Sequence, residues 1–148
     1  RIDNLAARVR ISQIPQHGGG MAKPSRSAEL LEFEIAFYQR LLNEKPDFVE
    51  ALMALGEAYT RRGWHEKGLE IDRRLTQLKA ENPVIWYNLA CSLSLLRRLD
   101  ESLDALQRAM ALGYDDFEFL AKDPDLDALR RSPQFRRFLE TRSSSASS

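Results

Sequence analysis

Cysteine and histidine are scarce in this sequence. Cys91 is the single cysteine among 148 residues, so an internal disulfide is excluded and a reducing compartment is favoured. The two histidines, His17 and His65, leave a zinc site short of its usual ligands. We therefore expect no metal, no other cofactor and a cytoplasmic location.

Long apolar runs and an excess of charge of one sign are also missing. No apolar stretch approaches the roughly 20 residues that span a bilayer, and residues 1–10 carry charges where a secretory signal would be apolar. Lys and Arg together number 22, as do Asp and Glu, so no net charge attracts nucleic acid or an anionic membrane. We expect neither a nucleic-acid partner nor a membrane partner.

The alternating pattern of β-strands is lacking as well, and apolar residues recur at helical spacing instead, as at Leu52, Leu55 and Tyr59. An all-α fold is predicted. The expected helices, with boundary errors of about 2–4 residues, span 28–43, 48–62, 66–79, 83–97, 100–112, 117–122, 125–131 and 133–141.

Local chemistry marks the ends of these helices. Asp47 and Glu50 have the spacing of a capping box, which predicts a helix start between them. Gly63 and Gly113 are predicted to end helices in the left-handed conformation. Polar side chains that precede a helix are predicted to cap its first turn, in three cases directly before a proline: Ser25 or Ser27, Asn82, Asp123 and Ser132.

The chain aligns with itself at a fixed offset that keeps large residues opposite large ones and small opposite small. A period of about 34 residues is typical of a solenoid whose unit is one pair of antiparallel helices. The small pairs are expected where two helices of a hairpin cross at close range. The aligned pairs include Leu52 with Trp86, Leu55 with Leu89, Gly56 with Ala90, and Gly68 with Ser102.

The repeat resembles the tetratricopeptide repeat (TPR) family, whose first helix carries the pattern W-x2-L-G-x2-Y. The sequence LMALGEAY (52–59) gives Leu-x2-Leu-Gly-x2-Tyr, and WYNLACSL (86–93) gives Trp-x2-Leu-Ala-x2-Leu. Pro46 stands where an earlier unit would have its proline. The sequence departs from the family pattern at three points. The first unit has Gly68 where the family usually has alanine and Asp72 where it usually has an aromatic residue. The second unit lacks the glycine and the tyrosine of the pattern. The resemblance, over about 28–114, implies a right-handed α-α superhelix of antiparallel hairpins of a small bacterial type.

The predicted helical domain covers 28–141, with repeats at about 49–82 and 83–116 and C-terminal capping helices at 117–141. Apolar residues of this capping segment are expected to cover the open end of the stack: Phe117, Leu120, Leu126, Leu129, Phe135, Phe138 and Leu139. Residues 1–27 and the serine-rich residues 142–148 are predicted to be disordered.

Three alternatives fit the stretch HGGGM (17–21). A His-Gly-Gly-Gly run occurs in the oxyanion loop of lipases and esterases, but the chain has no G-x-S-x-G elbow and no predicted strand to carry one. The glycines also fit a linker. The third interpretation, which we favour, is that Met21 starts the native protein and residues 1–20 are non-native. The competing idea is a genuine segment in which Ile2, Leu5 and Val9 dock in the groove of the repeats.

The prediction for function is therefore a non-catalytic scaffold, not an enzyme, that binds a partner protein or peptide. The alternative is a structural or self-associating subunit of a larger assembly, hence a homo-oligomer, and the least favoured is a hydrolase using HGGG. In the TPR family the concave face, built mainly by first helices, holds the peptide. Helical spacing places these residues on that face: Glu50, Met53, Glu57, Arg61, Tyr87, Asn88, Cys91 and Leu95.

Overall fold

The computed structural model describes residues 25–146, and every regular element within that range is helical. The elements are α2 (Arg26–Glu44), α3 (Val49–Arg62), α4 (His65–Leu78), α5 (Pro83–Leu95), α6 (Leu99–Ala111), α7 (Phe117–Leu120), the 3-10 helix η2 (Pro124–Leu126), α8 (Asp127–Arg130) and α9 (Pro133–Ala146).

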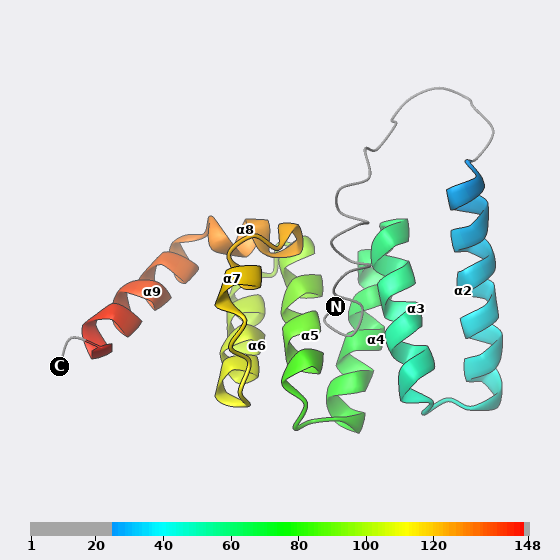
Figure 1. The fold of residues 1–148 in the computed structure, drawn as a ribbon, viewed down its shortest axis with the longest axis horizontal. Coiled ribbons are helices and arrows are strands. Elements are labelled where there is room, and N and C mark those ends of the chain that lie inside the picture. Colours follow the sequence, from blue (N-terminus) through cyan, green and yellow to red (C-terminus); the bar gives the residue numbers. More distant parts are fainter. Residues whose placement is uncertain (1–24, 147–148) are drawn as a thin grey trace.

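The long helices α2 to α6 stand side by side, and each runs antiparallel to the next (Figure 1). Their principal contacts join neighbours along the chain, from α2 with α3 to α5 with α6. The short elements η2 and α8 pack on α5, and α9 leaves the stack at an angle. This arrangement confirms the predicted fold class, an all-α solenoid of consecutive helix hairpins. None of the helices in the described range has the length and apolar character that a membrane span requires.

Most of the predicted caps are present. Ser25 Oγ accepts a hydrogen bond from the Ala28 amide at 3.2 Å, and Asn82 Oδ1 accepts one from the Val84 amide at 2.9 Å. Asp123 and Ser132 cap their own turns in the same way. The capping box of Asp47 and Glu50 is wrong: α3 starts after Phe48 without a side-chain cap. The Asp47 carboxylate instead accepts a hydrogen bond from Arg74, because the antiparallel hairpin places α4 beside the start of α3.

Several helix ends differ from the prediction, among them the end of α5 at Leu95 instead of 97, and two of the differences fall at the bounds of the predicted domain. Helix α2 begins at Arg26, two positions before the expected start, and α9 continues past 141 to Ala146. The second difference overlaps the expected disordered tail at 142–148, of which 147–148 lie outside the described residues. Serine lowers helix stability only modestly, so a helix already formed extends through it. Of residues 1–27, also expected to be disordered, 1–24 lie outside the described residues, whereas Arg26 and Ser27 are helical.

The two hairpins cross through their small residues, as the offset of the repeat predicts. In α3–α4, a Cβ placed on Gly68 would lie 3.8 Å from the Gly56 carbonyl oxygen. In α5–α6, the equivalent Ser102 donates its hydroxyl to the Ala90 carbonyl oxygen at 2.7 Å. Both crossings are close enough that a large side chain would separate the helices.

The turns inside the two hairpins are also equivalent. After α3, the Gly63 amide bonds to the Thr60 carbonyl and the Trp64 amide to the Tyr59 carbonyl. The same two bonds recur one period later, at Arg97 and Arg98. Gly63 has a φ of 84° and Arg97 a φ of 61°, so both are left-handed although only one is glycine. The backbone plan of the repeat is therefore kept where the residue type is not.

The capping segment shares one core with the second hairpin. Leu126 and Leu129 of this segment are fully buried, and Leu120 and Phe135 nearly so, in a cluster that includes residues of α5 and α6. Phe117 and Leu139 of the same segment are 49% exposed. The segment thus covers the end of the stack with most, though not all, of the residues expected to do so.

Candidate protein-interaction surface

The eight residues predicted to face a partner fall into two groups of four. Helix α3 carries Glu50, Met53, Glu57 and Arg61, and α5 carries Tyr87, Asn88, Cys91 and Leu95. Glu50 is exposed, and Met53, Arg61 and Leu95 are half-buried. The other four, Glu57, Tyr87, Asn88 and Cys91, are buried.

The side chains of Tyr87 and Cys91 converge on Asp123 of the capping segment. The Tyr87 hydroxyl donates a hydrogen bond to Asp123 Oδ2 at 2.6 Å, and Cys91 Sγ lies 3.7 Å from the same oxygen. Asp123 is fully buried, and its other oxygen caps η2 by accepting from the Asp125 amide at 3.0 Å. Asp123 therefore joins α5 to the start of η2.

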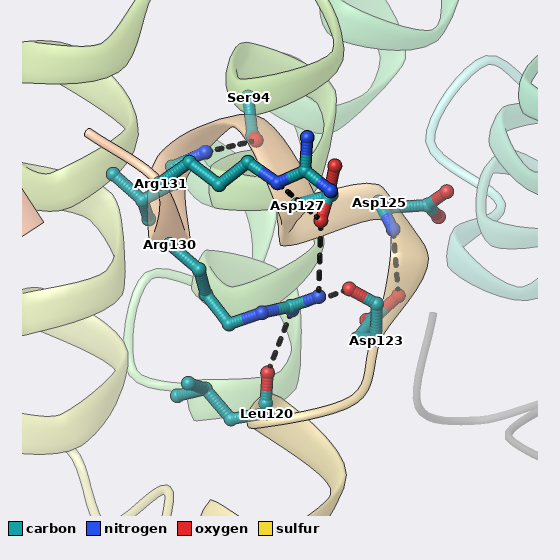
Figure 2. A network of polar contacts seen from close by, with 8 residues as sticks. Ser94, Leu120, Asp123, Asp125, Asp127, Arg130 and Arg131 are labelled. Carbon is teal, nitrogen blue, oxygen red and sulfur yellow. Dashed lines mark hydrogen bonds and ion pairs between the residues drawn. The ribbon is translucent and has the colours of Figure 1, made fainter.

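One further contact fixes this segment on α5 and others hold the segment together, as Figure 2 shows. Ser94 Oγ accepts a hydrogen bond from the Leu129 amide at 3.2 Å. The guanidinium of Arg130 donates to the Leu120 carbonyl at 2.9 Å and to the Asp123 carbonyl at 2.5 Å. The positions of α5 that the sequence assigns to a partner are thus occupied in part by the chain's own residues 120–129.

Tyr87 lies at the centre of an aromatic cluster. Its ring stacks on Tyr114 with centroids 4.5 Å apart and an interplanar angle of 26°, and lies 6.1 Å from Phe119. Burial raises the pKa of the Tyr87 hydroxyl far above its usual value, and the neighbouring Cys91 and Asp123 raise it further. Burial likewise raises the pKa of Tyr114. Both hydroxyls are therefore neutral hydrogen-bonding groups of the core.

The α3 group is more accessible than the α5 group. Arg61 donates a hydrogen bond to Glu34 Oε1 of α2 at 2.6 Å, which ties its guanidinium to the neighbouring helix. Its Nε atom is buried and makes no hydrogen bond to the described residues. Exposed Glu50 and half-buried Met53 lie one turn apart near the start of α3. These two residues offer an acidic and an apolar contact side by side.

Two exposed apolar areas at the ends of the stack do not appear among the predicted site residues. One is the outer side of α2, where Leu30, Phe33 and Phe37 are 60%, 71% and 52% exposed. The sequence indicates this area by a second series of apolar residues at helical spacing on α2, in addition to the series that packs on α3. The other is a hollow of about 210 Å³ between α6, α7 and α9, lined by Leu106, Met110, Phe117, Leu120, Phe135, Phe138, Leu139 and Arg142.

The residues behind the hydrolase alternative are not in the described range, because HGGGM occupies 17–21. Within 25–146, no group of three or more His, Cys, Asp and Glu side chains is arranged to hold a metal ion. Two acidic side chains of the capping segment, Asp123 and Asp127, are engaged in capping and ion pairs. Asp123 caps η2, and Asp127 pairs with Arg130 at 3.8 Å and with Arg131 at 3.4 Å.

Comparison with known proteins identifies two relatives. The chain is 32% identical over 112 residues to a chloroplastic protein of Arabidopsis thaliana, and the match covers 74% of this chain and 33% of that protein. It is 28% identical over 80 residues to the TPR repeat-containing protein MJ1428 of Methanocaldococcus jannaschii, and this match covers 54% of this chain and 14% of that protein. No protein-family model matches the chain. The chain spans a third or less of these relatives, and it is similar over half of its length to a TPR repeat-containing protein.

Proposed function

We propose that this chain is a TPR-type module that binds a partner protein or peptide and has no catalytic activity of its own. The observation that carries the proposal is the repeated hairpin: crossings, turns and hydrogen bonds recur one period apart, in a stack of consecutive helices. Similarity to a TPR repeat-containing protein supports it. Stacked hairpins of this kind present continuous surfaces that are suited to recognition.

The proposed domain is 28–141, with repeats at 49–82 and 83–116 and the cap at 117–141. Its single thiol, Cys91, is buried beside Asp123, which suits a protein of a reducing compartment such as the cytoplasm. Residues 1–20 remain, on this proposal, outside the functional unit.

The proposed contact surface is the accessible part of the predicted groove. Of the eight predicted residues, Glu50, Met53, Arg61 and Leu95 have exposed atoms, whereas the buried four support the fold. A partner peptide that suits this surface has an apolar side chain for Met53 and a basic one for Glu50. Methionine adapts to partners of different shape because its side chain is unbranched and flexible.

The test is partner capture from a lysate of the native host, followed by mass spectrometry. The variant Glu50→Lys with Met53→Glu reverses the charge and removes the apolar contact. Because Met53 also packs against the core cluster of Leu52, Leu75 and Ile85, the circular dichroism spectrum of the variant must match that of the wild type. We expect it to lose partners that the wild type retains. Glu70→Lys, an exposed change on α4, is the matched control and should retain them. Equal capture by the wild type and the double variant would exclude this part of α3 as the binding surface.

A further inference from the structure

Helix α2 has two apolar sides, and within residues 25–146 only one of them packs against other helices. Leu31, Tyr38 and Leu42 pack with buried Ile35 against the next helix, in clusters that include Leu55. Leu30, Phe33 and Phe37 follow one another at intervals of three and four residues and are all more than half exposed. In a helix, that spacing places them in one stripe. An aromatic stripe of this kind, on the first helix of the described range, is suited to pack against another helix.

The charged residues of α2 divide in the same way. Glu32 and Glu34 pair with α3, at 2.5 Å to Arg62 and 2.6 Å to Arg61. Four other charged residues of α2 have no ion pair with the described part of the chain, and they lie beside the apolar stripe: Arg26, Glu29, Arg40 and Glu44. These four charges are available to a partner that packs on the stripe.

The order of these charges identifies the partner. The midpoint between Phe33 and Phe37 is Ile35, and positions equally far from it face one another when two α2 helices run antiparallel. Arg26 then faces Glu44 of the other helix, because the two lie equally far on either side of the midpoint. Glu29 lies within one position of Arg40. A parallel pair would instead set each charge against its own kind.

We propose that α2 is the homodimer interface of this protein, in which the stripes of two copies pack antiparallel about a two-fold axis. Phe33 of each copy lies against Phe37 of the other, and the pairs Arg26–Glu44 and Glu29–Arg40 form twice. A two-fold interface requires one self-complementary surface, and α2 meets that requirement in both shape and charge. Exposed Ala36, near the centre of the helix, allows the backbones to approach. This interface is separate from the surface proposed on α3 for a partner peptide.

The experiment is sedimentation equilibrium of the full chain over a wide concentration range at low salt. The wild type should show a monomer–dimer equilibrium. Glu29→Arg and Arg40→Glu each convert two attractive pairs into two repulsive ones, and each alone should weaken the dimer by about tenfold. Mixing the two variants restores attraction in both pairs, so the mixture should form a heterodimer. In a parallel pair each single variant would keep the like-charge contacts of the wild type and cause no weakening. Weakening by each variant alone, followed by restoration in the mixture, is therefore specific to the antiparallel register.

Control variants test whether this surface, and not another, forms the dimer. Phe33→Asp with Phe37→Asp should be monomeric with an unchanged circular dichroism spectrum, because both side chains are exposed. Leu139→Asp, at the opposite end of the stack, should leave the dimer intact. The proposal is overturned by a wild type that stays monomeric, by a mixture of the charge variants that does not associate, or by loss of the dimer in Leu139→Asp. A monomeric full chain that dimerises after removal of 1–20 would also overturn it, since the stripe would then be covered by that segment.

Discussion

The hairpins α3–α4 and α5–α6 follow the same backbone plan but end with different surroundings. In the first, the predicted groove positions Glu50 and Met53 remain accessible. In the second, the corresponding helix is covered by Asp123 and the residues that follow it, which bond to Tyr87, Cys91 and Ser94. The repeat therefore determines how helices cross, whereas the neighbouring element determines which groove positions stay open.

The same divergence is seen in the cores of the two hairpins. Asp72 and Leu106 occupy equivalent positions of the two repeats, and both are fully buried. Asp72 accepts a hydrogen bond from Ser92 on α5, whereas Leu106 packs in the apolar cluster around Tyr87. The first position joins one hairpin to the next by a polar contact, which the second hairpin has no need to repeat because the cap follows it.

The largest expected effect comes from removing the side chain of Asp123, which joins the capping segment to α5 of the second hairpin. Asp123→Ala leaves the buried Tyr87 hydroxyl without this acceptor and removes the cap of η2, so we expect a loss of about 2–4 kcal/mol in the free energy of unfolding. Urea denaturation measures this loss, and labelling of Cys91 by a thiol reagent should become faster. Exposed Asp115→Ala is the control and should change stability by less than about 0.5 kcal/mol. An Asp123→Ala variant as stable as the wild type would show that this connection contributes nothing.

Alkaline pH should weaken the second hairpin through Tyr87. An unfolded tyrosine loses its proton near pH 10, whereas burial raises the pKa of folded Tyr87, so the folded state keeps a proton that the unfolded state releases. Its contribution is therefore full below about pH 10 and falls by about 1.4 kcal/mol for each pH unit above it. Urea denaturation from about pH 9 to about pH 11 measures the slope. Tyr87→Phe should have a shallower slope, and equal slopes in the two proteins would contradict the assignment.

The equivalence of the two turns can be tested by exchanging the residue types at their left-handed positions, Gly63 and Arg97. Gly63→Arg places a side chain in a left-handed conformation where no described residue beyond the two chain neighbours lies within 4 Å of the new Cβ, so its cost is conformational, about 1 kcal/mol. Arg97→Gly relieves the same conformation in the second turn and should gain roughly 0.5–1 kcal/mol, reduced by the greater freedom of glycine in the unfolded chain. Thermal unfolding measures both. Changes of the same sign would mean that the two turns are not equivalent.

The smallest expected effect is that of Gly68→Ala, at the crossing of α3 and α4. A Cβ on Gly68 would meet Thr60 Oγ1 at 3.6 Å and Ser92 Oγ at 3.9 Å, which are ordinary contacts. Gly68→Ala should therefore gain about 0.5 kcal/mol from helix propensity. Gly68→Leu is too large for the crossing and should lose roughly 1–3 kcal/mol. If alanine destabilises as much as leucine, the crossing is tighter than these contacts indicate.

Much of the fold follows from the sequence because its signals are local or periodic. The caps at Asn82 and Ser132 and the left-handed Gly63 depend on a few adjacent residues, and they are confirmed. The small crossings follow from the period of the repeat and are confirmed as well. The capping box at Asp47 is wrong because Arg74, distant in sequence, offers the carboxylate an ion pair.

The candidate site is less predictable because burial depends on distant segments. Helical spacing places Tyr87 and Cys91 on the groove side of α5, but it contains no information about a segment that starts only near Leu120 and folds onto them. The sequence Asp123-Pro124 fits a simple helix cap equally well. The second function of Asp123, as the acceptor for Tyr87, depends on the path of the chain after Gly113. Whether the remaining groove positions bind a partner stays a prediction.

The position of α2 has a consequence for motion. Within the part of the chain that the structure describes, this helix packs mainly on α3, whereas α5 is held from several sides by α4, α6, η2 and α8. In a linear stack, stability is a sum of units and of the contacts between neighbours, so an end with one neighbour opens most readily. Amide hydrogens of α2 are therefore expected to exchange with solvent fastest among the long helices and those of α5 slowest. Opening of the chain would begin at the helix that carries the exposed aromatic stripe, and pairing of that stripe would slow it.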